Sequence, residues 1–574
     1  MSIGEDRFVS RRRLLQGLAA LGMSPVFARA VAAQVDGAPR VTPEMLANAE
    51  WIAGVEMSDK DRELMRNGVA DLLDSYESNR RVDLDNSVVP WNGPPRPTNN
   101  AAPDRTITTA QPAKAAAVSG DDLAFAPVTH LADLIRRRQL SSVELTRFYL
   151  ERLHRFDPQL ECVITVTEKL ALEQAEKADR EIASGRYRGP LHGIPWGAKD
   201  LLALPGYLTT WGAKPYRGQM RKETATVIRR LEEAGAVLVA KLTLGALAWG
   251  DVWFGGKTKN PWNLEQGSSG SSAGSAAATA AGLAGFTIGT ETWGSIVSPC
   301  TRCGATGLRP TFGRVSRFGA MALSWSMDKI GPITRSVEDC ALVFNAIHGA
   351  DGLDPTAVNA PFDWPVKRDV RTLRVGYVKA LFDAEPEVDN EAMRARIQEQ
   401  RDFDRRTLGV LRDLGVELVP IELPEKYPLE SLGLILTAEA ATAFDELTRS
   451  GRDDLLVRQI EQAWPNSFRQ GQTIPAVEYL RANRIRTLVQ EEMEEKIRDV
   501  DVYVTPSFGG NHLLLTNLTG HPSVVLPNGF RAGDGTPTSI TFGGRLYGES
   551  EVLAVANAYQ QATDFHLKRP PLEA

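Results

Sequence analysis

The sequence has few cysteines, no excess of basic charge and no long apolar run. Four cysteines in 574 residues are too few for a disulfide framework. The formal net charge of −6 and the pI near 5.8 argue against a nucleic-acid partner, which a basic stripe would normally signal. No segment reaches the length of a membrane-spanning helix, so we expect no integral membrane segment in the mature chain.

The first 33 residues are predicted to be a signal peptide. Residues 10–15 read Ser-Arg-Arg-Arg-Leu-Leu and precede a mildly apolar run at 14–27, with small-residue cleavage sites at 28–32. This layout is typical of a twin-arginine export signal. We therefore expect residues 1–33 to direct export to the periplasm or the medium. A basic N-terminus without structure is the alternative.

The rest of the chain divides by composition. Apolar spacing between residues 41 and 80 predicts two short helices, within an N-terminal helical extension over 34–88. Residues 89–120 are rich in Pro, Ala and Asn and are predicted to be an extended linker. The main domain is predicted over 121–574. It includes a more helical and charged insertion at about 365–500.

The main domain has the pattern of an α/β layer fold. Ser141 and Glu144 form a capping box that opens a helix, and a second helix is predicted over 224–234. The apolar residues 236–240 that follow read as a fully buried strand. Helices that alternate with short apolar strands imply a central sheet covered by helices.

The chain is organised around residues 267–295. A Gly/Ser-rich loop comes first, at 267–274, and its glycines allow positive φ and close backbone approach. The Ala-rich residues 275–282 predict a buried helix, and 283–288 predict a short strand. A turn with the sequence Gly-Thr-Glu-Thr-Trp-Gly-Ser closes the stretch. A flexible linker would also be rich in Gly and Ser, but it would lack the helix-forming run.

A second cluster, Gly189 to Asp200, contains Lys199 after a short apolar segment. With this cluster the chain resembles the amidase signature family of Ser-Ser-Lys hydrolases. Ser271 and Ser295 stand 24 residues apart (295 − 271), which is the spacing of the family's bridging and nucleophilic serines. The resemblance covers roughly residues 122 to 565, in the family's order. Its further blocks are Asn260–Asn263, Gly307–Arg317, Gly331–Asp339 and Thr516–Pro522.

The resemblance implies a fold and a catalytic triad. The fold would be a central mixed, twisted β-sheet with helices on both faces. Ser295 would be the nucleophile, Ser271 would relay its proton after a cis Gly270–Ser271 peptide bond, and Lys199 would be the base. Lysine acts as a base only when neutral, which requires burial to lower its pKa from about 10.4. The alternatives are a surface Lys199 paired with Asp200, an ordinary cap at Ser271, and a relay serine at 268 or 269.

An amide-hydrolysing serine enzyme also needs donors for the oxyanion. The resemblance points to four backbone amides, those of Thr292, Trp293, Gly294 and Ser295. The chain departs from the family motif here: Glu291 replaces an Asp, Trp293 replaces a Gly, and Val297 replaces an Arg that commonly pairs with that Asp. Trp293 must therefore adopt whatever dihedrals Gly allowed, and the partner of Glu291 is not identifiable from the sequence.

Trp249, Trp253 and Trp325 are candidates for an apolar or aromatic acyl pocket beside the nucleophile. Core filling is the alternative for all three. No cofactor and no metal are implied. Cys300 and Cys303 have redox or zinc spacing, but the sequence offers no second pair and no nearby histidine, so both are interpreted as packing residues.

The predicted function is hydrolysis of carbon–nitrogen bonds other than peptide bonds, in small linear amides, through an acyl-enzyme on Ser295. One alternative is the A subunit of a glutamine-dependent tRNA amidotransferase, which shares fold and triad and serves a partner. The export signal argues against that alternative, because charged tRNA is cytosolic. A non-catalytic binding protein with the same fold is the second alternative. The oligomeric state is open, and a homodimer is one candidate.

Overall fold

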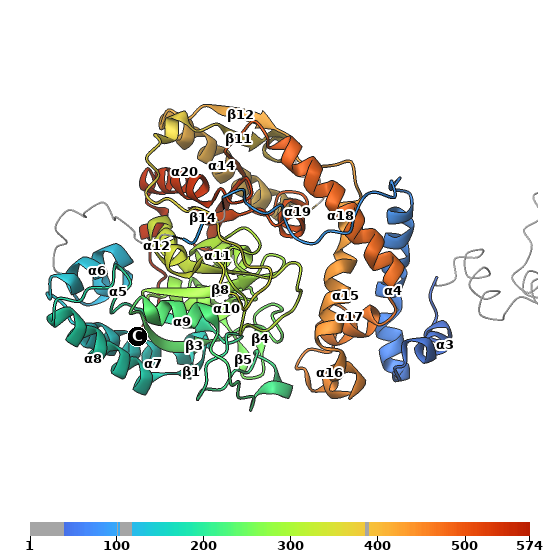
Figure 1. The fold of residues 1–574 in the computed structure, drawn as a ribbon, viewed down its shortest axis with the longest axis horizontal. Coiled ribbons are helices and arrows are strands. Elements are labelled where there is room, and N and C mark those ends of the chain that lie inside the picture. Colours follow the sequence, from blue (N-terminus) through green and yellow to red (C-terminus); the bar gives the residue numbers. More distant parts are fainter. Residues whose placement is uncertain (1–39, 100, 104–117, 385–389, 574) are drawn as a thin grey trace, which may run out of the picture. The chain divides into compact units, whose positions relative to one another are not determined.

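The computed structural model describes residues 40–99, 101–103, 118–384 and 390–573. The chain forms two compact units (Figure 1). The first combines residues up to 85 with 430–454 and 458–483, and the second contains 86–429, 455–457 and 484 onward. The predicted export signal at residues 1–33 lies outside the described residues.

The second unit is built on a mixed sheet of 11 strands, in the order β1-β3-β2-β8-β10-β9-β14-β15-β13-β11-β12. β2 is parallel to both of its neighbours, β3 and β8, and β11 is parallel to β12 and β13. The other pairs are antiparallel, so the predicted mixed α/β sheet is confirmed. The strands are β1 Val163–Val166, β2 Pro195–Lys199, β3 Val237–Leu242, β8 Phe286–Glu291, β9 Thr306–Arg309, β10 Lys329–Thr334, β11 Val375–Val378, β12 Leu418–Ile421, β13 Val502–Pro506, β14 Ser523–Phe530 and β15 Pro537–Gly544.

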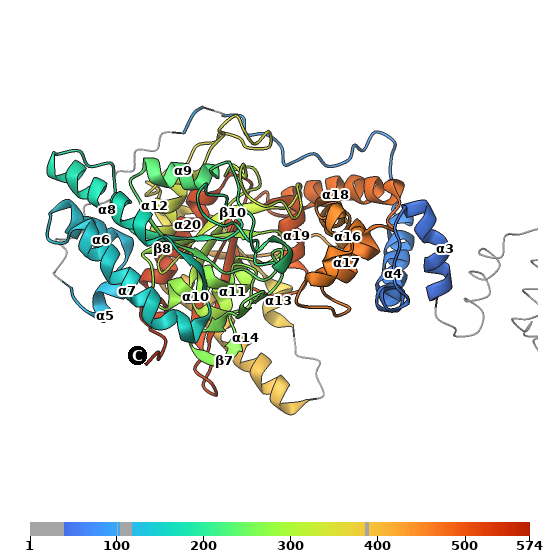
Figure 2. The ribbon, with the colours of Figure 1, turned by 90° about the horizontal axis from the view of Figure 1, so that it is seen from below.

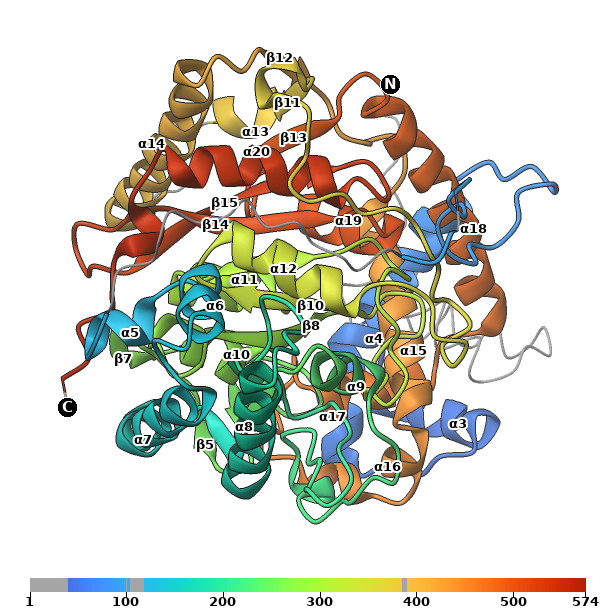
Figure 3. The ribbon, with the colours of Figure 1, turned by 60° about the vertical axis from the view of Figure 1, so that its left-hand side comes forward.

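Helices pack on both faces of this sheet. α10 and α11 contact each other on one face, and α12 contacts α9 and α20 on the other, as Figure 2 shows around β8 and β10. In Figure 3, α20 runs along β14 and β15. The helices of this unit are α5 Asp121–Phe125, α6 Val128–Arg136, α7 Ser142–Leu160, α8 Glu168–Ala183, α9 Thr226–Glu233, α10 Ala273–Ala280, α11 Val297–Cys303, α12 Val337–Ile347, α13 Lys379–Asp383, α14 Glu391–Asp413, the part of α18 (Ala476–Lys496) from residue 484 onward, α19 His512–Thr519 and α20 Glu549–Gln561.

Two hairpins of short strands lie outside the sheet, and short 3-10 turns connect some of the elements. The hairpins join β4 Val252–Trp253 to β5 Gly256–Lys257, and β6 Lys259–Asn260 to β7 Asn263–Gly267. Both belong to the segment that precedes the Gly/Ser-rich loop. The 3-10 turns are η1 Lys214–Tyr216, η2 Val370–Thr372, η3 Leu429–Gly433, η4 Arg452–Leu455 and η5 Phe565–Leu567.

Local sequence explains the elements that hold the central stretch. The capping box at Ser141 opens α7 as predicted, with reciprocal bonds between Ser141 and Glu144. α10 consists of small residues that are all buried, so it lies close to the sheet. A Cβ on Gly274 would come within 2.3 Å of the Cys162 carbonyl and 2.5 Å of the Thr243 amide, which is why the helix begins with so small a side chain.

The first unit is helical. α3 (Pro43–Ala53) and α4 (Asp59–Arg80) pack against each other through Leu46, Met65 and Val69, and α4 also contacts α17 (Trp464–Gly471). α4 has 22 residues, so the prediction of two short helices is wrong for the second one. It begins after the N-cap Ser58, which forms a capping box with Asp61. The remaining helices are α15 Leu434–Ala443, α16 Asp445–Arg449 and the first turns of α18 Ala476–Lys496.

The structure also tests the predictions for one helix–strand pair, the cysteines and membrane-spanning segments. Helix α9 ends before Gly235, which has a φ of +83°, and the buried strand β3 follows as predicted. All four cysteines are buried free thiols, as expected of packing residues. Across the described ranges, the longest helices are too polar to cross a bilayer. The predicted domain boundaries stay predictions.

Candidate active site

Lys199 is the last residue of β2 and is fully buried. β2 and its parallel neighbour β8 carry Lys199 and Thr290 to the same edge of the sheet, since the carboxyl ends of parallel strands meet there. The side-chain nitrogen of Lys199, Nζ, lies 2.9 Å from Ser271 Oγ, 3.1 Å from Ser272 Oγ and 2.8 Å from Thr290 Oγ1. Its hydrogen-bond partners are therefore hydroxyls and one carbonyl rather than a carboxylate.

The surroundings of Lys199 favour the neutral amine. Burial lowers the pKa of Lys199 to about 7, although the charges of Asp328 and Glu291 act in the opposite direction. The alternative of a surface lysine paired with Asp200 is wrong. Asp200 is itself buried and pairs with Lys241, with 2.6 Å between Asp200 Oδ1 and Lys241 Nζ.

Ser271 lies in the Gly/Ser-rich loop and is 1% exposed. The Gly270–Ser271 peptide bond is cis, as the resemblance implied. Gly270 has no room for a side chain, because a Cβ there would come within 1.8 Å of the Gly250 carbonyl oxygen. The hydroxyl of Ser268 bonds the carbonyl of Ser269. The serine hydroxyls that the structure brings to Lys199 are those of Ser271 and Ser272.

Ser295 follows β8 in the turn that leads into α11. The amide of Ser272 donates to the Ser295 carbonyl at 3.1 Å, which holds this turn beside the Gly/Ser-rich loop. Ser295 is 9% exposed. In the described part of the chain, no direct hydrogen bond joins the hydroxyls of Ser271 and Ser295. The structure therefore places the three predicted triad residues in one neighbourhood and links two of them directly.

The turn at 292–297 leaves a run of backbone amides free. In the described chain the amides of Trp293, Gly294 and Ser295 have no hydrogen-bond acceptor, whereas those of Ile296 and Val297 donate to Glu291. Gly294 adopts the positive φ of this turn, at +88°, and Trp293 does not. The substitution of Trp for Gly at 293 is therefore compatible with the turn.

Glu291 finds its partner on another strand. Its Oε1 accepts from Arg309 at 2.7 Å and from Asn517 at 2.8 Å, and its Oε2 accepts the amides of Ile296 and Val297. Burial by itself raises the pKa of Glu291, but the Arg309 charge and these hydrogen bonds outweigh it and set the pKa at about 2. The sequence offered no signal for this pairing, because Arg309 lies in β9 and Asn517 in α19.

A cavity of about 370 Å³ adjoins the site. Thr290, which bonds Lys199, is one of its lining residues, and so is Thr292. Trp325 also lines it and is 48% exposed. Trp249 and Trp253 are partly buried and are not among the lining residues of this cavity, and Trp253 packs edge-on against Phe254. Of the three predicted pocket residues, the structure gathers Trp325 at the cavity.

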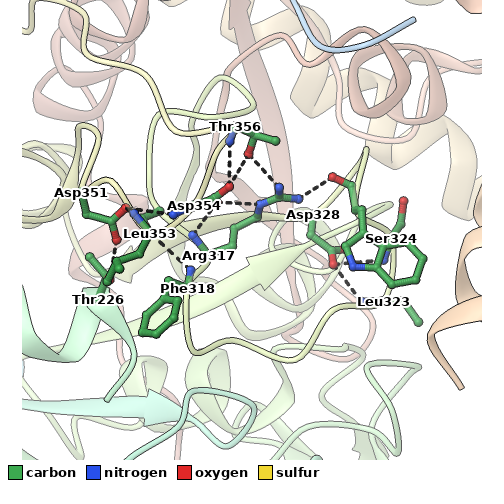
Figure 4. Close-up of polar contacts among 12 residues, drawn as sticks. Thr226, Arg317, Phe318, Leu323, Ser324, Asp328, Asp351, Leu353, Asp354 and Thr356 are labelled. Atoms are coloured by element: carbon green, nitrogen blue, oxygen red, sulfur yellow. Dashed lines mark hydrogen bonds and ion pairs between the residues drawn. The ribbon is translucent and has the colours of Figure 1, made fainter. Parts of the chain in front are cut away.

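The wall of this cavity is held by Arg317. Its Nε donates to Asp354 at 3.1 Å, its Nη1 to the Trp325 carbonyl at 2.6 Å, and its Nη2 to Thr356 Oγ1 at 2.7 Å (Figure 4). One guanidinium therefore ties the loop of Trp325 to the loop of Asp354 and Thr356. In the same view, Asp328 accepts the amides of the residues at 323 and 324.

Comparison with known proteins gives the class. The family model for amidases matches residues 144–553, so the chain belongs to the amidase family, whose enzymes act on carbon–nitrogen bonds. The A subunit of the glutamyl-tRNA(Gln) amidotransferase of Roseiflexus sp. (strain RS-1) is 35% identical over 486 residues, which are 77% of this chain and 97% of that protein. Its counterpart in Moorella thermoacetica is 34% identical over 500 residues, or 79% and 99% of the two chains.

Among solved structures, the native peptide amidase from Stenotrophomonas maltophilia superposes with a TM-score of 0.66. It is 29% identical, and the match covers 78% of this chain and 98% of that one. The family thus includes relatives that are named as components of an amidotransferase and enzymes that are named for the amides they hydrolyse.

Proposed function

We propose that this protein hydrolyses amides through an acyl-enzyme on Ser295, with Lys199 as the base and Ser271 as the proton relay. The observation that carries the proposal is the contact of 2.9 Å between Ser271 and the buried Lys199, whose pKa is about 7. A pKa there leaves a large neutral fraction at physiological pH, so the amine can accept a proton.

The proposed proton transfers leave each group of the relay in its starting state once the amine has left. As Ser295 Oγ attacks the amide carbonyl, its proton passes to Ser271 while the Ser271 proton passes to Lys199. When the tetrahedral intermediate collapses, Ser271 donates a proton to the leaving nitrogen and Lys199 returns one to Ser271. The amide of Thr292 and the free amides of residues 293–295 are the donors proposed for the oxyanion. One such donor contributes about 3–4 kcal/mol to the transition state.

A fluorophosphonate probe tests the nucleophile. We expect one covalent adduct, on Ser295, and none in Ser295→Ala. Ser298, the second residue of α11, gives the matched control, and Ser298→Ala should label normally. A folded sample that does not label would instead support the alternative of a non-catalytic binding protein.

The comparisons favour a second candidate, the A subunit of a glutamine-dependent amidotransferase. Its support is the identity of 34–35% to such subunits over almost their whole length, against 29% to the peptide amidase. On sequence similarity this candidate is better supported than a free-standing amidase. Ammonia release from glutamine, together with co-purification of partner subunits, would establish it. Turnover of simple amides by the isolated chain, with neither of these, would favour the amidase.

We also propose that the chain is exported by the twin-arginine route, on the sequence of residues 10–32 alone. Fusing residues 1–33 to a reporter tests this. Export should require Arg11 and Arg12, and replacement of both by lysine should abolish it. A reporter that stays in the cytoplasm would remove the main argument against the amidotransferase.

A further inference from the structure

The cavity of about 370 Å³ is lined by Thr290 and Thr292, at the end of β8. Thr290 connects the cavity to Lys199, because it lines the cavity and its Oγ1 lies 2.8 Å from Lys199 Nζ. The same nitrogen lies 2.9 Å from Ser271 Oγ. The cavity is therefore connected to Ser271 through two hydrogen bonds, from Lys199 Nζ to Thr290 and from the same nitrogen to Ser271.

The cavity is lined mostly by apolar side chains. Its volume lies at the small end of the range of about 300–1,000 Å³ for ligand pockets, enough for a single ring or two fused rings. Trp325 has a half-exposed ring, so a ligand can contact its face. The apolar side chains of the wall include Leu201, Phe318, Met321, Leu323, Trp325 and Ile330.

The charged residues of the wall are engaged elsewhere. Arg317 and Asp354 neutralise each other, with 3.1 Å between their charged groups. Asp328 accepts from the Thr292 hydroxyl and from the amides of residues 323 and 324, and burial raises its pKa. Lys329 donates to the Met327 carbonyl, and burial lowers its pKa. Because the hydrogen-bonding atoms of these charged groups are already used by partners within the protein, the cavity suits a neutral group.

We propose that this cavity, called the amine pocket from here on, binds the amine portion of the substrate, and that this portion is an uncharged aromatic or compact apolar amine. The inference rests on the proposed function. Because Ser271 returns the proton to the leaving nitrogen, that nitrogen and its substituent must lie on the side of Ser271 and Lys199. The amine pocket is on that side. The sequence had suggested an acyl pocket here, and the geometry points to the other half of the amide.

Filling the pocket tests the proposal. Ala322 is partly buried in its wall, and Ala322→Phe places a ring inside it. The substrates form two series: propionamide against propionanilide, which vary the amine, and acetamide against hexanamide, which vary the acyl group. We expect Ala322→Phe to lower kcat/KM for the anilide at least tenfold relative to propionamide, and to leave the ratio within the acyl series within twofold. Ala183→Phe, on the exposed end of α8, is the matched control.

Two other results would overturn the assignment. A variant that changes only the acyl series places the acyl group in this cavity, and a variant that changes neither series takes the cavity out of substrate binding. Trp325→Ala covers the case in which Ala322→Phe does not fold. It should weaken the anilide preference at least threefold, with the exposed Trp51→Ala as control.

Product binding separates a failure of this inference from a failure of the proposed function. 2-Naphthylamine, followed by its own fluorescence, should bind the wild type and bind Ala322→Phe at least tenfold more weakly. Cationic benzylamine should bind neither. Binding of the naphthylamine without any labelling of Ser295 would retain the pocket and reject the acyl-enzyme. If Ser295 is labelled but both proteins bind 2-naphthylamine equally well, the acyl-enzyme is retained and the amine pocket is rejected.

Discussion

Two fully buried lysines lie on neighbouring strands and have different surroundings. Ala198, next to Lys199, pairs with Lys241 across the parallel strands β2 and β3. Lys241 contacts the carboxylate of Asp200 at 2.6 Å, whereas Lys199 has only hydroxyls and a carbonyl within reach. Burial lowers the pKa of both, and Asp200 opposes the effect directly at Lys241. Equal burial thus gives an ion pair at one lysine and a titrating amine at the other.

The largest expected effect is on activity at the unpaired lysine. Lys199→Met should lower kcat/KM by about 10²- to 10⁴-fold, since general-base catalysis contributes a factor of this size. The variant should melt close to the wild type, because it removes a buried amine that has no counter-ion. Lys214→Met, at an exposed lysine, is the control. Near-normal turnover of Lys199→Met at neutral pH would contradict the role of base.

At the paired lysine the expected effect is on stability instead. Lys241→Met leaves Asp200 buried without its cation, which should lower the free energy of unfolding by about 3–5 kcal/mol. Urea denaturation measures it. Asp200→Asn in the same chain should recover most of the loss. An unchanged unfolding midpoint in Lys241→Met would mean that the ion pair with Asp200 does not stabilise the protein, and that Lys241 does not differ from Lys199 in this respect.

Glu291 and Arg309 form a second buried ion pair, and its loss should affect stability and activity together. Arg309→Met should cost about 3–5 kcal/mol of stability as well, and it should also lower kcat because Glu291 holds the amides of the turn. Glu291→Asp together with Val297→Arg rebuilds the pair that the amidase signature family commonly has. Added to Arg309→Met, these two changes should restore part of both losses. No recovery would show that Arg309 does not stand in for the missing arginine.

A carboxylate beside Lys199 should turn the unpaired site into a paired one. In the wild type the base is neutral above its pKa of about 7, so kcat/KM should rise with pH through that value and then level off. Thr290→Asp places a negative charge beside Lys199 and favours the charged amine. The rise of kcat/KM should therefore occur about 1–3 pH units higher. Thr290→Asn is the isosteric control. Identical pH profiles for the two variants would exclude Lys199 as the titrating group.

The smallest effect is expected at Ser272. Its hydroxyl lies 3.1 Å from Lys199 Nζ, accepts the Thr290 amide at 3.1 Å and donates to the Thr290 carbonyl at 3.0 Å. Ser272→Ala removes the hydroxyl that accepts the partly buried Thr290 amide, at a cost of about 1–3 kcal/mol of stability. Activity should fall only a few-fold, because Ser271 is intact. A loss as large as that of Ser271→Ala would exchange the roles of the two serines.

Sequence reasoning located the loops of the site but not the contacts that complete it. Lys199, Ser271 and Ser295 lie in local patterns of glycine, serine and alanine whose spacing is readable along the chain. Neither Ser272 nor Thr290 has a local sequence signal for its contact with Lys199. Both contact Lys199 where β2, β8 and the Gly/Ser-rich loop meet, which brings residues 73 and 91 positions apart into hydrogen-bond range. Arg309 and Asn517 reach Glu291 from still other elements.

The sequence by itself determined the α/β class, the order of the central elements and the family, because these follow from periodicity, capping and short motifs. Only the tertiary structure decided which lysine has a counter-ion, which amides stay free and where an uncharged cavity lies. Each of these depends on burial and on atoms that distant strands bring within a few ångströms. A local pattern specifies the loop, and the packed sheet sets the protonation state of the groups within it.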